Sequence, residues 1–281
     1  MLALLLACTG SPSTAEPSVP VIVATSFPAW YLADRLTDVE VRCILPPGAD
    51  PQAWQPDGDL IASLAAADLI VSSGAGFEAW MATAALPESR VVDLSAGLSL
   101  IHLEADTHSH GIGGEHSHAG IDPHTWLDPI SYRTQAETLA AALPRIGLTP
   151  VDLPGLQTQL DALDADYAAQ LSDPRLPVLV ANHPAYHYLA RHHGLTIPSL
   201  DLDPQTPPEI APTLPSGAVL LWETPPADAV MSAIPVRHIV LDPLEQPPAG
   251  ATYDYIAQSQ ANIARLEELL AAAGDGDHSH Q

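Results

Sequence analysis

The chain has 281 residues, 47% of them hydrophobic, which is enough apolar material for one large core or two smaller ones. Nine Lys and Arg residues oppose 34 Asp and Glu residues, so the formal net charge at pH 7 is -25. This charge opposes binding to nucleic acids and anionic lipid surfaces and favours cations, although high acidity is equally typical of a surface adapted for solvation in salt. The composition therefore predicts a globular protein without a nucleic-acid partner.

The first residues indicate export. Residues 1–7 form a short apolar run that leads into Cys8, and a Ser-, Pro- and Thr-rich stretch follows. The segment Leu5–Cys8 resembles a bacterial lipobox, in which the signal is removed and the cysteine becomes the lipidated first residue. The run lacks basic residues and is shorter than a usual signal, so the true start could lie upstream. We expect a lipoprotein signal at 1–7, lipid on Cys8 and a tether at 8–18.

The N-terminal half alternates strand and helix patterns. Short β-branched runs at 19–26, 39–45, 67–73 and 89–95 predict strands. Apolar residues at helical spacing lie between them at 28–36, 57–67 and 77–85. After a long interruption a helix is expected from Asp128, which is a typical N-cap residue followed by proline. Alternating strands and helices predict a parallel sheet.

A long helical pattern at 153–171 follows, and the alternation then restarts. Strands are expected at 176–183, 218–223 and 236–242, and a terminal helix at about 252–273. The prediction is an α/β fold of two βα lobes, each around a mainly parallel sheet of about four strands, with a metal site in the cleft between them. The expected parts are an N-terminal lobe at 19–150 with a His-rich loop at 102–118, a connecting helix at 151–173, a C-terminal lobe at 174–273 and a His-containing tail at 274–281.

Polar side chains follow several of the predicted strands. Ligands of open parallel sheets bind beyond the carboxyl ends of the strands, and these ends carry Asp50, Gln52, His124, His183, Glu223 and Asp242. Imidazoles together with carboxylates suit a divalent first-row metal. Each residue alone is also typical of a hydrogen-bonding side chain or an ordinary turn, so the prediction rests on their convergence.

Four sequence motifs indicate a protein family. They are "PPGADPQAWQP" at 46–56, "DPHTWLDP" at 122–129, "NHPAYHYLARHHGL" at 182–195 and "VLDPL" at 240–244. Together they resemble the zinc- and manganese-binding solute-binding proteins of bacterial ABC importers. The resemblance implies two α/β lobes joined by a long helix, with metal ligands at His124, His183 and Asp242.

The sequence departs from that family at one ligand. Relatives have Asp-Pro-His in the first motif, whereas this chain has Gln52 in place of the histidine. A glutamine amide is a poorer zinc donor than imidazole. Glu223 stands at a strand end where relatives carry a glutamate, and it is the preferred fourth ligand. Gln52, a water molecule, or a loop histidine such as His116 or His118 are the alternatives.

The remaining histidines fall into two groups. A cluster in the predicted loop, and the "DHSH" stretch at 277–280, resemble the His-rich segments with which the family collects zinc weakly; a solvated low-complexity segment is the other interpretation. The histidines outside these tracts and the expected site are predicted to be structural: His102, His187, His192, His193 and His238.

The predicted function is binding of a divalent transition metal, most simply Zn²⁺ with Mn²⁺ as the alternative, outside the cytoplasmic membrane. The metal would be delivered to an ABC permease and its ATPase by a lipid-anchored receptor that is not an enzyme. A zinc hydrolase is the competing class, because three protein ligands and an open position also describe a catalytic site. The sequence has neither HExxH nor GxSxG. A metal buffer without a transporter is the third hypothesis.

Overall fold

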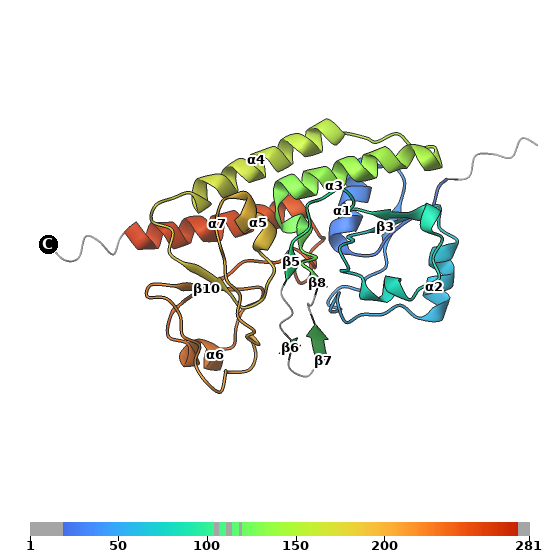
Figure 1. The fold of residues 1–281 in the computed structure, drawn as a ribbon. Helices are drawn as coiled ribbons and strands as arrows, with labels where there is room; N and C mark the ends of the chain where they lie inside the picture. The colour runs from blue at the N-terminus through green and yellow to red at the C-terminus, as the bar shows by residue number, and fades with distance from the viewer. Residues whose placement is uncertain (1–18, 104–106, 111–113, 118–119, 275–281) are drawn as a thin grey trace, which may run out of the picture.

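The computed structural model describes residues 19–103, 107–110, 114–117 and 120–274, arranged as two α/β lobes beneath a pair of long helices (Figure 1). The expectations for Cys8, His118 and the stretch at 277–280 lie outside these residues. None of the helices in the described ranges is both long and apolar enough to cross a membrane.

The N-terminal lobe is built on a four-stranded parallel sheet in the order β2-β1-β3-β4. Its central strands are buried on both faces, as expected for a parallel sheet covered by helices. The elements of this lobe up to the end of the sheet are β1 (Ile22–Ala24), α1 (Phe27–Leu36), β2 (Val41–Cys43), α2 (Gly58–Ala65), β3 (Leu69–Ser72) and β4 (Val91–Asp93).

The C-terminal lobe has a three-stranded parallel sheet in the order β11-β10-β9 within the described residues, where about four strands were predicted. Beside this sheet, Ala181 and Ser199 form a single isolated parallel bridge. The elements of this lobe are β9 (Leu179–Ala181), α5 (His187–His192), β10 (Val219–Trp222), α6 (Asp228–Ala233), β11 (Arg237–Val240) and α7 (Tyr255–Gly274).

Two helices join the lobes. Helix α3 (Pro129–Ala142) starts at Asp128, whose side chain accepts a hydrogen bond from Ser131 N, and this confirms the predicted cap. Helix α4 (Leu153–Leu171) is the predicted connecting helix and runs from the junction of the lobes over the C-terminal lobe (Figure 1). It packs on α3 and α7 through a stripe with helical spacing: Leu156, Leu160, Leu163, Tyr167 and Leu171.

The expected helix at 77–85 is instead a 3-10 turn at Ala79–Ala82. The preceding turn needs positive φ angles, including 52° at Ala75. Glu78 reaches back to it, because its carboxylate accepts hydrogen bonds from the backbone of Ser73 and Gly74. These contacts bend the chain at the point where a longer helix would begin.

The predicted His-rich loop contains two short antiparallel strand pairs. Strand β5 (His102–Leu103) pairs with β8 (Gly120–Ile121), and β6 (Thr107–His110) pairs with β7 (Gly114–Ser117). The register places His108 opposite His116. In Figure 1 the β6–β7 pair projects from the region between the lobes. Strand β8 ends directly before the DPHTW motif, so this ladder leads the chain into the candidate site.

Candidate metal site between the lobes

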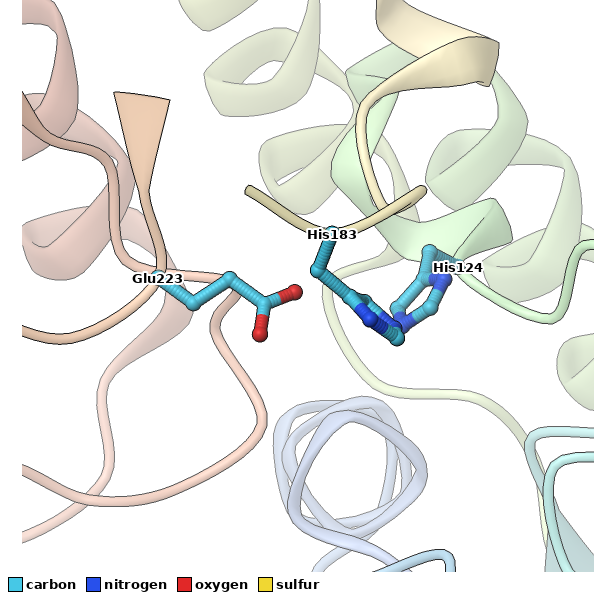
Figure 2. A group of neighbouring side chains, drawn as sticks. All are labelled: His124, His183 and Glu223. Atoms are coloured by element: carbon cyan, nitrogen blue, oxygen red, sulfur yellow. The ribbon is translucent and has the colours of Figure 1, made fainter. Parts of the chain in front are cut away.

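Three of the predicted ligands meet at the junction of the lobes. His124, His183 and Glu223 each offer one ligand atom, and these atoms lie within 4.8 Å of one another. Figure 2 shows the Glu223 carboxylate pointing toward the two imidazole rings. The ring centroids of His124 and His183 are 5.7 Å apart, and the rings are nearly perpendicular at 84°. The group therefore has the residue types and the spacing of a metal site.

The C-terminal sheet positions two of these side chains. His183 follows β9 and Glu223 follows the neighbouring strand β10, so both lie at the carboxyl edge of one sheet. Asn182 ties the two strand ends together: its backbone N–H donates to Leu221 O, and its side-chain oxygen accepts from Glu223 N at 3.1 Å. The pair is thus held by rigid backbone.

His124 comes from the other lobe and is fixed by the motif around it. Asp122 Oδ1 accepts hydrogen bonds from the backbone N–H of His124 at 2.9 Å and from its Nδ1 at 2.8 Å. The His124 side chain is only 1% exposed, and its ring packs against Phe77 and Trp126. With Nδ1 bound to Asp122, the lone pair for a metal lies on Nε2.

Two atoms at the centre of the group are buried without a hydrogen bond. They are His124 Nε2 and Glu223 Oε1. Buried polar atoms are nearly always paired in folded proteins. A cation would satisfy both Glu223 Oε1 and His124 Nε2, which lies in an ion-pair contact of 3.2 Å with Glu245 Oε1. The donors present, imidazole nitrogen and carboxylate oxygen, fit zinc and also accept manganese.

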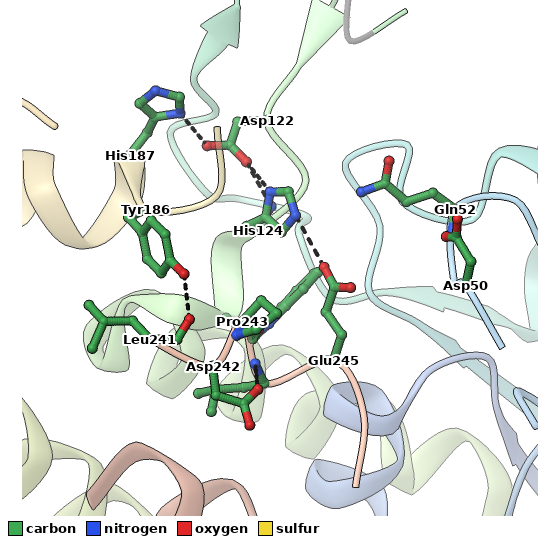
Figure 3. Close-up of polar contacts among 12 residues, drawn as sticks. Asp50, Gln52, Asp122, His124, Tyr186, His187, Leu241, Asp242, Pro243 and Glu245 are labelled. Carbon is green, nitrogen blue, oxygen red and sulfur yellow. Dashed lines mark hydrogen bonds and ion pairs between the residues drawn. The ribbon is translucent and has the colours of Figure 1, made fainter. Parts of the chain in front are cut away.

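Glu245 is a further carboxylate at the site that the sequence analysis did not identify. Its Oε1 lies 3.2 Å from His124 Nε2 (Figure 3). The residue stands in the loop after β11, three positions beyond the predicted ligand Asp242. The signal that could have found it is an acidic residue following the same strand end, in the sequence "LDPLE".

Asp242 lies outside the group of three. Its Oδ1 accepts a hydrogen bond from Leu244 N at 2.8 Å, and its Oδ2 lies 3.4 Å from Gln258 Nε2. This turn holds Leu244 at a positive φ of 58°. The negative charge of Asp242 helps to raise the pKa of Glu223. Its role as a metal ligand stays a prediction, and it would require this turn to rearrange.

Gln52 lies on a loop of the N-terminal lobe. Its backbone N–H donates to Asp50 Oδ1 at 2.9 Å. In Figure 3 its side chain extends from that loop on the side of the His124 ring. Gln52 and the carboxylates of Asp242 and Glu245 are therefore the candidates for a fourth ligand.

Burial and neighbouring charges shift the pKa values of the side chains at the site. Burial opposes protonation of His124, but the hydrogen bond to Asp122 and the carboxylate of Glu245 outweigh it and raise the pKa of His124 to about 10. Burial and the negative charge of Glu245 raise the pKa of Glu223. Burial alone would also raise the pKa of Asp122, but hydrogen bonds from His124 and His187 lower it. The carboxylates thus crowd a point that a divalent cation would neutralise.

Comparisons with known proteins agree with this architecture. The sequence model of the family described as zinc-uptake complex component A, periplasmic, matches residues 22–214. The chain is 25% identical to the zinc-binding lipoprotein AdcA of Streptococcus pneumoniae, over 90% of this chain and 56% of that protein. It is 24% identical to the high-affinity zinc uptake system protein ZnuA of Bacillus subtilis, over 68% of this chain and 64% of that protein. The chain thus spans less than two thirds of the length of these relatives.

Solved structures share the fold. The Zn(II)-bound ZnuA-like domain of S. pneumoniae AdcA superposes with a TM-score of 0.68 at 21% identity, covering 89% of this chain and 98% of that domain. The solute-binding protein FpvC of Pseudomonas aeruginosa, in complex with Mn²⁺, superposes with a TM-score of 0.63 at 20% identity, covering 92% of this chain and 99% of that one. Because the family model matches most of the chain, this protein belongs to the family of periplasmic A components of zinc-uptake complexes.

Proposed function

We propose that this protein captures Zn²⁺ outside the cytoplasmic membrane and delivers it to an ABC permease with its ATPase. The observation that carries the proposal is the meeting of His124, His183 and Glu223 within 4.8 Å at the junction of the two lobes. Two imidazoles favour zinc over manganese, since manganese sites usually contain more oxygen ligands. In a component of an uptake complex the metal is cargo rather than a cofactor.

The geometry suits reversible binding. His124 is carried by one lobe, and His183 with Glu223 by the other, so the ion would join the lobes when bound and be released as they part. A zinc hydrolase would in addition need a coordination position open for water. Glu245 and Gln52 are the residues that we propose to complete or tune the coordination.

The proposal includes a lipid anchor at Cys8. It is supported by the lipobox-like sequence and by the curated name of the pneumococcal relative, a zinc-binding lipoprotein. Mass spectrometry of the N-terminus of the protein from its native host tests it. A diacylated Cys8 at the first position is expected, and an unmodified cysteine or a different mature start would remove the anchor.

Competition titration against a zinc chelator tests the binding site. His183→Ala should weaken the tightest site at least tenfold, that is by about 1.4 kcal/mol or more, because a ligand is lost. His102→Ala, at an exposed position in β5, is the matched control and should keep wild-type affinity. Wild-type affinity in His183→Ala would place the metal elsewhere.

Uptake of radioactive zinc separates a carrier from a buffer. In the native host without the endogenous gene, the wild-type chain should restore uptake and His124→Ala should not. Equal uptake with and without the protein would leave only the buffering role.

A further inference from the structure

A second group of ligand-type side chains lies where α3, α4 and α5 meet. Asp164 is on α4, His192 is the last residue of α5 and His193 is its C-cap. Each offers one ligand atom, and the three atoms lie within 4.8 Å of one another. From the sequence alone, both histidines are predicted to be structural.

Two atoms of this group are buried without a hydrogen bond: Asp164 Oδ1 and His193 Nε2. They are 3.6 Å apart, and the His193 side chain is only 8% exposed. That separation is too long for a hydrogen bond. It is close to the roughly 3.4 Å between two ligands of a tetrahedral zinc ion with bonds of about 2.0–2.1 Å.

His192 supplies the second imidazole of the group, with a carboxylate already bound to it. Its Nδ1 lies 2.6 Å from Asp128 Oδ1 and 3.6 Å from Asp164 Oδ1. Its ring stacks on that of His193, with 3° between the planes and 4.6 Å between the centroids. Because Asp128 occupies Nδ1, the nitrogen that His192 would offer to a metal is Nε2.

An ion-pair cluster without a metal explains only part of this arrangement. A protonated His192 would satisfy Asp128, but Asp164 Oδ1 and His193 Nε2 would still lack a hydrogen bond. His193 also helps to line a pocket of about 470 Å³.

We propose that Asp164, His192 and His193 form a second binding site for a divalent first-row cation, with Asp128 orienting His192. The site is distinct from the group around His124 and does not depend on the transport function. An ion there would bind the connecting helix to α5 and, through Asp128, to the start of α3. It would thereby brace the join between the lobes.

Equilibrium dialysis with zinc tests the site on the full chain. The double variant Asp164→Asn/His193→Gln should bind one zinc ion fewer per chain than the wild type at saturation. The His-rich stretches are identical in both proteins, so their contribution cancels. The matched control is Asp161→Asn, which removes one acid from the same helix, and it should bind as many ions as the wild type.

A second measurement covers the case in which the double variant does not fold. Anomalous diffraction at the zinc edge from wild-type crystals grown with excess zinc should show a peak between Asp164 Oδ1 and His193 Nε2. Unchanged stoichiometry in a folded double variant, or the absence of this peak while the site at His124 is occupied, would overturn the proposal.

Discussion

Asp122 fixes His124 through a single oxygen, because Oδ1 accepts from both the backbone N–H and Nδ1 of that histidine, at 2.9 and 2.8 Å. Its other oxygen accepts from His187 Nδ1 at 2.9 Å, and the Asp122 side chain is fully buried. The buried carboxylate thus sets both the tautomer and the direction of the imidazole that we propose as a zinc ligand (Figure 3).

Asp122→Asn should lower zinc affinity by about 10- to 100-fold, the usual effect of removing a carboxylate behind a ligating histidine. The amide keeps the size of the side chain but can no longer stabilise the correct tautomer with a full charge. Chelator competition measures the change. Asp34→Asn, on the exposed face of α1, should have wild-type affinity, and an equal loss in both variants would point to a general charge effect.

Two variants test whether the fourth zinc ligand comes from the His-rich loop or from a strand end. Deleting residues 106–118 should reduce the number of weakly bound zinc ions but leave the tightest site within about threefold, a change under ~1 kcal/mol. Recruiting the loop would cost roughly 1–2 kcal/mol of backbone entropy per ordered residue. Glu223→Gln should weaken the tightest site much more. Isothermal calorimetry compares the two, and the reverse pattern would make a loop histidine the ligand.

Zinc binding should release protons at neutral pH. The pKa of His124 is raised to about 10, so the metal-free protein holds a proton on this ring at pH 7, and zinc must displace it. Affinity should therefore keep rising with pH through the range in which an ordinary histidine, with a pKa near 6.5, has already lost its proton. Calorimetry in buffers of different ionisation enthalpy counts the protons released on zinc binding. If no proton is released at pH 7, the expected protonation of His124 is contradicted.

Gln246 links the two lobes beside the site. Its Oε1 accepts from Gly48 N at 3.0 Å, and its Nε2 donates to Ala49 O at 2.7 Å. Gln246→Ala removes both hydrogen bonds, each worth about 0.5–1.5 kcal/mol. Stopped-flow release of zinc to a chelator should become about tenfold faster. Gln159→Ala, which removes a hydrogen bond to Arg35 away from the site, should leave the rate unchanged; equal rates in all three proteins would exclude a role for this link.

The strand–helix alternation predicted the two lobes and the connecting helix because buried parallel strands and long helices leave clear hydrophobic periods. The rule that ligands gather at strand ends brought His124, His183 and Glu223 together in advance. It could not find Asp122 or Glu245, because their roles depend on the direction of a side chain within a turn. The sequence could not place His192 and His193 beside Asp164 for a different reason: they meet it only through helix packing, at 28 or more residues of separation.

The central claim is most directly tested by crystallography of the chain with one equivalent of zinc, using anomalous differences at the zinc edge. The account predicts one dominant peak about 2.0–2.2 Å from His124 Nε2, a nitrogen of His183 and an oxygen of Glu223. A dominant peak elsewhere, with these three side chains free of metal, would contradict it.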